Sequence, residues 1–385
     1  MNSAADKPKL CVMQVLPALI SGGVERGTVD IAFALIQQGH QAIVVSSGGG
    51  MVKQLNDMGA THISLPVQSK KPWVMWKNAQ VLKKIIQDYN VDIVHARSRA
   101  PAWSCYWASN HTKTPYITTF HGAYGHSNRL KRWYNSVMLK GNLTIAVSNF
   151  ISEHIIKIYQ PDFKNIQVIH RGIDTEVFSS TRIDTSRVDK LRKKWNISAS
   201  KTVIMLPGRL TRLKGHSILI NAISQMEHTG FICLFVGDNH GNTSYQNELE
   251  TLIKKLKLEK TIQLVGGCND MPAAYQLADI VISASIKPES FGRISCEAQA
   301  MNCLVVATNH GGTKEVLSPS QQLFLCEPNN SQAMYQALTK ALTTPSKEQA
   351  TIFKQSRKYI EANFSLDKMC HDTLAIYQTE ADKKL

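Results

Sequence analysis

Residues 288–301 read PESFGRISCEAQAM and place two carboxylates, Glu289 and Glu297, eight positions apart. A Phe-Gly turn and the start of a helical pattern lie between them. On one helix the carboxylates would stand roughly 12 Å apart and about 80° around the axis from each other, so they would share neither a proton nor a metal. With Glu289 in a loop and Glu297 on a helix, the pair could contact two parts of one elongated ligand. The alternative is a Glu289 that favours the helix dipole and a Glu297 solvated on the helix face.

The composition indicates an ordinary globular chain with an anionic partner. A length of 385 residues predicts two domains, and 43% hydrophobic with 19% charged residues allows an ample core. The net charge of +15 points to nucleic acid, an acidic membrane surface or a phosphorylated substrate.

The eight cysteines show neither a Cys-x-x-Cys pair nor the Cys/His spacing of a zinc site. Most lie in apolar runs, which predicts reduced core residues of a cytoplasmic protein. No apolar run reaches the roughly 20 residues that span a bilayer. The apolar residues 11–20 include Gln14 and Pro17, so we interpret them as a first strand rather than a signal peptide.

The N-terminal half has the pattern of a doubly wound α/β sheet. Residues 10–16 predict a strand, residues 28–38 an amphipathic helix and residues 42–46 the next strand. Gly22 and Gly23 in the first turn would let the backbone approach a ligand, and the helix after them would offer N–H groups to an anion. The Gly-x-Gly-x-x-Gly dinucleotide fingerprint is absent.

Two further positions stand at predicted element ends. His121 follows the predicted strand 115–120, at the edge where open α/β sheets bind ligands; a histidine satisfied within its loop is the alternative. Residues 179–200 are polar and lack a strand pattern, which sets a domain boundary near residue 180. Residues 364–377 predict a helix.

Residues 93–152 contain seven Lys or Arg and no Asp or Glu, with Trp and Tyr interleaved. The segment Arg129, Lys131, Arg132 and Trp133 suits a lipid interface, because cations contact phosphate and aromatic rings occupy the headgroup boundary. A solvated helix end with buried tryptophans is the competing interpretation. Nucleic acid is ranked last, because no recognised nucleic-acid module accompanies the charge.

The motif around Glu289 resembles the Glu-x7-Glu region of retaining GT-B glycosyltransferases of family four, in particular those that build lipopolysaccharide cores and glycolipids. Pro-Glu-Ser-Phe-Gly is followed by Glu297-Ala298, then by VVAT at 305–308 and GGTKE at 311–315. The Gly-Arg-Leu block at 208–210 extends the resemblance, which covers nearly the whole chain. Two departures are Asn302-Cys303-Leu304, where the family usually has Gly-x-Pro, and Arg171, where it usually has Asn.

The resemblance implies two Rossmann-like domains that face each other across a cleft. Residues 1–179 would form the acceptor-binding domain and residues 180–360 the nucleotide-sugar-binding domain. Residues 361–385 would form a helix that crosses back to the first domain.

The resemblance also implies roles for individual residues. His121 and Glu289 would be catalytic, with both contacting the transferred sugar, while Glu297 would hold the ribose. Arg209 and Lys214 would neutralise the departing diphosphate, so that no metal or other cofactor is expected. The residues expected to bind the donor are Gly22, Gly23, Arg209, Lys214, Gly237, Asp270, Met271, Phe291, Gly292, Arg293, Ile294 and Glu297.

We therefore expect a sugar to pass, with retention of configuration, from a nucleoside diphosphate to a hydroxyl of a lipid-linked or lipopolysaccharide-type acceptor. The enzyme would be cytoplasmic or peripheral on the inner face of the cytoplasmic membrane, with an anionic membrane and no nucleic acid as partner. Two alternatives remain. One is a sugar-nucleotide epimerase or glycogen-type synthase on the same fold, and the other is a non-enzymatic basic protein that binds membrane or nucleic acid.

Overall fold

The computed structural model describes residues 9–20, 22–125, 128–160, 165–227, 230–239, 241 and 243–383. The chain forms two compact units, residues 1–172 with 366–385 and residues 173–365. The first boundary thus falls a few residues before the predicted position near 180. The end of the chain, from Leu366, belongs to the first unit.

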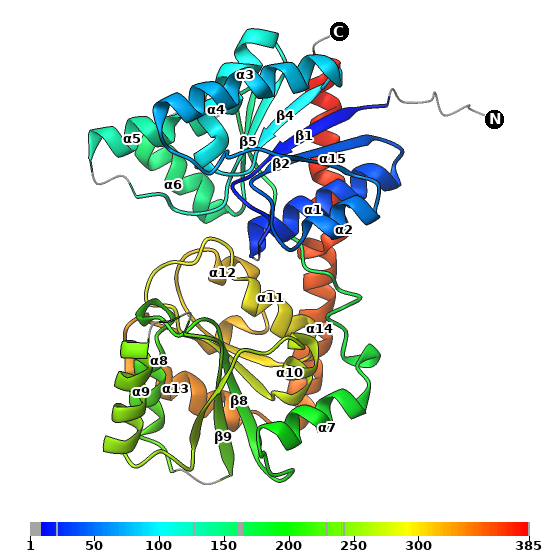
Figure 1. The fold of residues 1–385 in the computed structure, drawn as a ribbon. Helices are drawn as coiled ribbons and strands as arrows, with labels where there is room; N and C mark the ends of the chain where they lie inside the picture. Colours follow the sequence, from blue (N-terminus) through cyan, green and yellow to red (C-terminus); the bar gives the residue numbers. More distant parts are fainter. Residues whose placement is uncertain are drawn as a thin grey trace, which may run out of the picture. The chain divides into compact units, whose positions relative to one another are not determined.

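The first unit is a parallel sheet of order β3-β2-β1-β4-β5-β6-β7 (Figure 1). Parallel strands buried on both faces read as near-continuous apolar runs, which is the pattern of residues 10–16 and 42–46. The strands are β1 Cys11–Val15, β2 Gln41–Ser46, β3 Thr61–Ser64, β4 Ile93–Ala96, β5 Tyr116–Phe120, β6 Leu143–Ala146 and β7 Ile166–Val168.

Helices cover both faces of this sheet, so two cores form. Met13 and Val15 pack into one core, and Val12 and Leu16 pack into the other. Helices α3 Pro72–Asp88, α4 Arg99–Thr112 and α6 Asn149–Tyr159 contribute to the first core. Helices α1 Gly23–Gln37, α2 Val52–Asp57 and α15 Leu366–Asp382 contribute to the second. The short α5 Arg129–Ser136 and the 3-10 turn η1 Val137–Leu139 connect β5 to β6.

The second unit repeats this architecture with a parallel sheet of order β10-β9-β8-β11-β12-β13 (Figure 1). Its strands are β8 Thr202–Pro207, β9 Phe231–Val236, β10 Ile262–Gly266, β11 Ile280–Ser283, β12 Leu304–Thr308 and β13 Leu325–Cys326. Its helices are α7 Thr185–Lys194, α8 His216–Ile223, α9 Thr243–Lys255, α10 Met271–Leu277, α11 Arg293–Ala300, α12 Thr313–Val316, α13 Ser331–Leu342 and α14 Ser346–Phe364, with the 3-10 turns η3 Ser180–Arg182, η4 Arg212–Lys214 and η5 Gln322–Phe324.

In both sheets the order of the strands reverses between the first strand and the fourth, which are β1 and β4 in one unit and β8 and β11 in the other. Ligands of open α/β sheets bind outside the carboxyl ends of the strands at such a reversal. The prediction of two doubly wound α/β units is confirmed, and this topology marks one ligand-binding edge on each unit.

One predicted helix start was wrong, and one helix was not predicted. Helix α1 begins at Gly23 rather than near residue 28, because the glycines that suggest a loop are part of its first turns. The predicted tail helix at 364–377 is confirmed as α15, and Ser365 separates it from α14. Residues 99–112, which were interpreted only as part of a basic tract, form α4, and its Trp103 is buried.

The departure at Asn302 has a conformational explanation. Asn302 follows α11 with φ +60, in the left-handed region that a glycine or asparagine tolerates. Its side-chain amide donates to Ser180 Oγ at 2.8 Å. The asparagine thus takes the conformation that glycine would take and adds a contact to the start of the second unit.

Arg357 on α14 donates hydrogen bonds to residues near the start of the second unit and to the end of α11. Its Nη1 donates to the carbonyls of Phe178 and Ala300, the latter at 2.9 Å, and its Nη2 donates to Thr175 O at 2.7 Å. Carbonyl groups that lose such a donor in a partly buried setting each destabilise the fold.

We predict that Arg357→Ala lowers the free energy of unfolding by about 2–4 kcal/mol, because three carbonyls lose their donor. The neighbouring exposed Lys358→Ala is the matched control and should change it by less than about 0.5 kcal/mol. Urea unfolding followed by circular dichroism measures both values. Equal losses in the two variants would contradict the role of Arg357.

Candidate functional site

The carboxyl edge of the second sheet brings Lys214 and Glu289 together. Lys214 lies in the turn after β8 and Glu289 in the loop between β11 and α11, and Lys214 Nζ donates to Glu289 Oε1 at 2.6 Å. Ser285 Oγ donates to the same oxygen at 2.5 Å. Glu289 Oε2 makes no hydrogen bond to any residue that the structure describes. One carboxylate oxygen is therefore fixed by the protein and the other is left for a ligand.

The ionisation of Glu289 is set by opposing effects. Burial alone would raise the pKa of Glu289, but the charge and hydrogen bond of Lys214, the hydroxyl of Ser285 and the nearby His310 together hold the pKa below its ordinary value of 4.5. His310 is itself positioned by a contact of 2.7 Å between its Nε2 and Ser285 O. Glu289 is thus a carboxylate at neutral pH, and it can only accept hydrogen bonds.

The backbone around this pair requires glycine at several turns. A Cβ at Gly215 would lie 2.0 Å from Ala284 O, and a Cβ at Gly311 would lie 2.6 Å from Glu289 O. Both residues also have a positive φ, +72 and +63. The close approach of these loops holds the Lys214 turn and the Glu289 loop together without room for side chains.

Glu297 is held on α11 as a buried carboxylate. It is 7% exposed, accepts from Arg293 Nε at 2.5 Å through Oε1 and from the Tyr275 hydroxyl at 2.9 Å through Oε2. A glutamate solvated on the helix face is therefore excluded. Burial and the adjacent Glu297 charge raise the pKa of Tyr275 well above its ordinary value, so the phenol remains a donor.

The two other cations of the Lys214 turn have different surroundings. Arg212 forms an ion pair with Glu248 on α9 and lies 5.1 Å from the centroid of the Tyr245 ring. Arg209, directly after Gly208, is exposed. Within the described part of the chain, no hydrogen bond or ion pair involves the Arg209 side chain. Arg209 is therefore available for an anion, whereas Arg212 is held by the protein.

Several predicted donor-binding residues have structural roles of their own. Asp270 caps α10 through Ala273 N and forms two hydrogen bonds with Arg187, which together lower the pKa of Asp270 with the Arg187 bonds as the main cause. A Cβ at Gly237 would lie 2.0 Å from Gly208 O, so packing alone requires glycine there. The Phe291 side chain belongs to the core, which leaves only its backbone for a ligand.

Met271 begins α10, and Gly292 precedes the first residue of α11 with φ +97 and supplies no side-chain cap. Ile294 packs against the core beside Arg293. The expected donor contacts of these residues therefore rest on backbone groups and stay predictions.

The first unit has its own cluster at the carboxyl edge of its sheet. His121 follows β5, and its Nδ1 is 2.8 Å from Arg171 Nη2 after β7. Its Nε2 is buried and has no hydrogen-bond partner among the described residues. Burial, followed by the charges of Arg171, Arg97 and His95, holds the pKa of His121 well below 6.5. A neutral ring is therefore expected at neutral pH.

Arg97 and His95 are both buried, and they lie close enough to His121 to lower its pKa. Arg97 follows β4 and is 5% exposed, and burial lowers its pKa although a hydrogen bond to Tyr377 of α15 opposes this effect. The Tyr377 hydroxyl is 2.6 Å from His95 Nδ1, and His95 Nε2 is 2.7 Å from Thr119 Oγ1. The last helix of the chain thus supplies the polar partner of both groups.

The two glycines of the first turn, Gly22 and Gly23, lie close to side chains of this same chain. A Cβ at Gly23 would lie 2.2 Å from Arg171 Nη1, and a Cβ at Gly22 would lie 2.5 Å from Glu25 Oε2. The space beside Gly23 is thus filled by an arginine of this chain. A ligand contact at either glycine stays a prediction.

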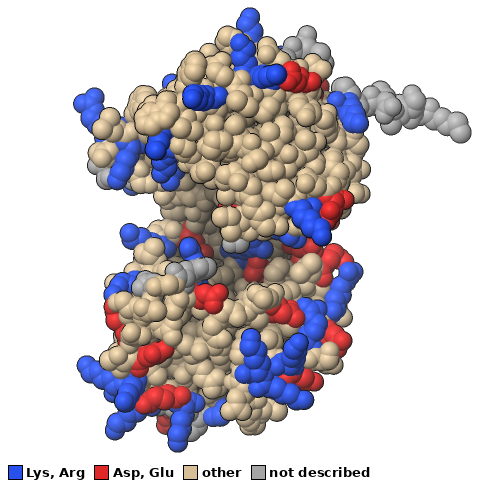
Figure 2. All heavy atoms as spheres, in the orientation of Figure 1, with Lys and Arg blue, Asp and Glu red and all other residues tan. Residues whose placement is uncertain are grey.

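The basic tract does not form one continuous surface. Arg97 and Trp103 are buried, whereas Leu130 and Trp133 on α5 are 77% and 61% exposed. Arg129, Lys131 and Arg132 are exposed on the same helix. A cavity of about 690 Å³ is lined by Lys70, Arg99 and side chains of α5, including Lys131 and Trp133. Figure 2 shows cations without acidic groups on the drawn face at the α5 end of the first unit.

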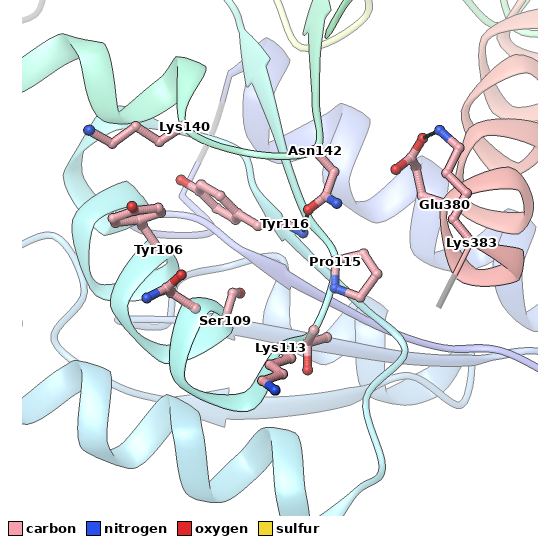
Figure 3. A pocket seen from close by; sticks show the side chains of 11 residues that line it. Tyr106, Ser109, Lys113, Pro115, Tyr116, Lys140, Asn142, Glu380 and Lys383 are labelled. Carbon is pink, nitrogen blue, oxygen red and sulfur yellow. Dashed lines mark hydrogen bonds and ion pairs between the residues drawn. The ribbon is translucent and has the colours of Figure 1, made fainter. Parts of the chain in front are cut away.

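A second cavity, of about 320 Å³, lies at the opposite edge of the first sheet, beside Pro115 at the start of β5 (Figure 3). Lys113 and Lys140 line it but extend in different directions, and Glu380 pairs with Lys383. Because the predicted site residues of this unit follow the carboxyl ends of the strands, this cavity is separate from them.

Residues that the sequence did not single out complete both clusters. Ser285 and His310 surround Glu289, and Arg171 contacts His121. Ser285 stands four residues before Glu289 and His310 directly before Gly311-Gly312, so their proximity to the motif was the available signal. Arg171 was visible only as a departure from the family pattern.

Comparisons with known proteins identify the class. The sequence model of Glycosyltransferase Family 4 matches residues 21–177, and that of Glycosyl transferases group 1 matches residues 187–359. A glycosyltransferase from Rickettsia africae ESF-5 has a similar structure, with a TM-score of 0.91 and 41% identity over 97% of this chain and 98% of that chain. The chain therefore belongs to the glycosyltransferase family that these two sequence models describe, and it has the GT-B fold. It is a glycosyltransferase of the EC 2.4 type.

More distant relatives share the architecture. Anabaena Alr3699/HepE in complex with UDP and glucose has a TM-score of 0.81 at 22% identity and covers 95% of this chain and 99% of its own. The phosphatidylinositol N-acetylglucosaminyltransferase GPI3 subunit of Saccharomyces cerevisiae strain YJM789 is 26% identical over 339 residues, which are 83% of this chain and 72% of that protein.

Two classes of feature are absent from the described residues. No group of three His, Cys, Asp or Glu side chains there could hold a metal ion. None of the helices there combines the length and apolar character that a bilayer crossing requires. The eight cysteines are all described and free, and seven of them are buried.

We predict that the stabilising effect of Glu289 depends on pH. Because its pKa is lowered on folding, the ionised side chain adds stability that is fully present above its ordinary pKa and is lost as the pH falls through the lowered value. Glu289→Gln should therefore be less stable than the wild type by about 1–3 kcal/mol near neutral pH, and this difference should shrink below about pH 4.

Urea unfolding at a series of pH values measures this difference. The exposed Glu259→Gln is the control, and its difference from the wild type should stay near zero throughout. A constant difference for Glu289→Gln across the series would show that the ion pair does not set its ionisation.

Proposed function

We propose that the protein transfers a sugar from a nucleoside diphosphate sugar to an acceptor hydroxyl with retention of anomeric configuration. The observation that carries this proposal is the Lys214–Glu289 ion pair, at 2.6 Å, at the carboxyl edge of the second sheet. It lies where the sheet topology favours a ligand, and it leaves one carboxylate oxygen and two ammonium donors for that ligand.

The diphosphate would be bound by the cations around this edge. Lys214 has three N–H donors and gives one to Glu289, so two can reach phosphate oxygens. Arg209 adds an exposed guanidinium whose fork matches two phosphate oxygens. As the sugar–oxygen bond breaks, negative charge grows on the diphosphate, and these fixed cations stabilise it without a metal or other cofactor.

The sugar and ribose would be held by the two glutamates. Glu289 Oε2 accepts hydrogen bonds from sugar hydroxyls, since Oε1 already contacts Lys214 and Ser285. Glu297 is fixed by Arg293 and Tyr275 and accepts from the ribose. His121 of the first unit donates from Nε2 to the sugar. The transition state resembles an oxocarbenium ion, and the leaving diphosphate takes the acceptor proton.

Known relatives support a sugar-nucleotide donor and a lipid acceptor. The Anabaena protein binds UDP-glucose in a solved complex, and the yeast relative is named for phosphatidylinositol. In this chain α5 presents exposed Leu130 and Trp133 between cations beside a basic cavity. This combination suits an anionic glycolipid or lipopolysaccharide-type acceptor at the inner face of the cytoplasmic membrane.

We predict that Lys214→Ala and Glu289→Ala each lower kcat for hydrolysis or transfer from the preferred donor by about 10²–10³-fold, because each removes a preorganised contact to the reacting group. A panel of UDP-, GDP- and ADP-sugars identifies that donor. Arg212→Ala is the matched control, since Arg212 pairs with Glu248, and its kcat should change by less than about threefold.

Circular dichroism would verify that the variants fold. Near-normal turnover in Lys214→Ala and Glu289→Ala would remove the proposed roles. Conversion of the donor to another sugar nucleotide without acceptor would favour an epimerase, and calorimetry with no binding of any donor would favour a non-enzymatic protein.

We predict that Lys131→Glu weakens binding to vesicles containing phosphatidylglycerol by about tenfold or more, because it reverses a charge beside the exposed Trp133. Lys193→Glu makes the same change of charge at an exposed lysine of α7, and the affinity of this variant for the vesicles should stay within about threefold of the wild type. Vesicle co-sedimentation measures both. Equal weakening in the two variants would indicate a general charge effect and contradict the α5 surface.

A further inference from the structure

The guanidinium of Arg171 lies close against the backbone of Gly23. It follows β7, and its Nη1 fills the space where a Cβ of residue 23 would lie, only 2.2 Å away. Gly23 is the first residue of α1, so a side chain there would displace the guanidinium. Asparagine, which the sequence resemblance leads us to expect at position 171, has a shorter side chain than arginine. Gly23 and Arg171 are therefore coupled by packing.

The hydrogen bond from Arg171 determines which nitrogen of His121 carries the proton. Arg171 Nη2 is 2.8 Å from His121 Nδ1, and a guanidinium can only donate. His121 Nδ1 must then accept, so the neutral ring carries its proton on Nε2. That Nε2 is buried and has no hydrogen-bond partner among the described residues. The ring thus presents one unsatisfied donor.

Burial is the main cause of the lowered pKa of His121, and the charges of Arg171, Arg97 and His95 act in the same direction. Arg171 contacts it from the loop after β7, while Arg97 and His95 lie on the β4 side. The Tyr124 hydroxyl accepts a long contact of 3.4 Å from His121 N, and Arg99 stacks on the Tyr124 ring. No carboxylate contributes to the lowered pKa of His121. An imidazolium would therefore be repelled from two sides.

We infer that Arg171 is a positioning residue that keeps His121 neutral with its proton on Nε2, so that this N–H is a fixed donor toward the ligand. The inference rests on the role proposed above for His121 and adds the residue that sets its state. An asparagine carries both a donor and an acceptor, so it could bind either tautomer. The arginine removes that choice. The ligand group that faces the N–H of His121 Nε2 is an oxygen that accepts a hydrogen bond, and a sugar hydroxyl or a phosphate provides such an oxygen.

The test observes the His121 ring directly, without donor or acceptor. Long-range ¹H–¹⁵N spectra of histidine-labelled full-length protein report the protonation and tautomer of each ring, and His121→Gln identifies the His121 signals. In the wild type we expect a neutral ring with bare Nδ1 from about pH 5.5 to pH 8. Arg171→Lys should retain this state, since an ammonium also only donates.

Arg171→Gln should let His121 populate the tautomer with its proton on Nδ1, because a glutamine amide can accept as well as donate and the obligatory donor is gone. Gly23→Ala should have the same effect by displacing the guanidinium, whereas Gly50→Ala, with open space beside it, should leave the His121 signals unchanged. The His95 signals, set by Thr119 and Tyr377, are the internal reference for an intact fold.

A wild-type His121 that carries its proton on Nδ1, or that titrates near 6.5, would overturn the inference. An unchanged His121 spectrum in both Arg171→Gln and Gly23→Ala would also overturn it. Donor hydrolysis by the wild type is scored separately. Absence of hydrolysis together with the expected spectra would refute the proposed function and leave the role of Arg171 standing.

Discussion

The contact between Lys214 and Glu289 is the interaction on which the second unit's edge depends. It joins the turn after β8 to the loop after β11, and these two strands flank the reversal of strand order. Ser285 and His310 come from the ends of β11 and β12, so three neighbouring strands converge on one carboxylate. Positions 215 and 311 require glycine because the converging loops leave no space there for a side chain.

The edge of the first unit uses a different arrangement. Arg97, Arg171 and two histidines lie close together there, and no carboxylate contributes to the lowered pKa of His121. A buried site with several positive charges favours an anionic or strongly hydrogen-bonding ligand. The two edges thus differ in chemistry: that of the second unit has a carboxylate with cations that it partly neutralises, and that of the first unit has hydrogen-bond donors.

The sequence predicted the class of fold and the location of the main motif, because both depend on local pattern. Buried parallel strands read as apolar runs, and the Glu-x7-Glu spacing places one carboxylate in a loop and one on a helix, as observed. Helix α4 was missed, because its tryptophans, its tyrosine and its small polar residues give no clear helical period. Ser285 and His310 were signalled only by their proximity to the motif and Arg171 only by its departure from the family pattern, because the contacts of His310 and Arg171 are made by loops that meet only in the folded sheet.

Helix α15 gives the first unit an unusual dependence on the end of the chain. Leu374, Tyr377 and Ala381 complete one of its two cores, and the Tyr377 hydroxyl is the partner of His95 and Arg97. During synthesis the N-terminal half therefore emerges from the ribosome with this core covered by α1 and α2 but still lacking α15. It can reach its final packing only after residue 381 has been made, which is later than every residue of the second unit.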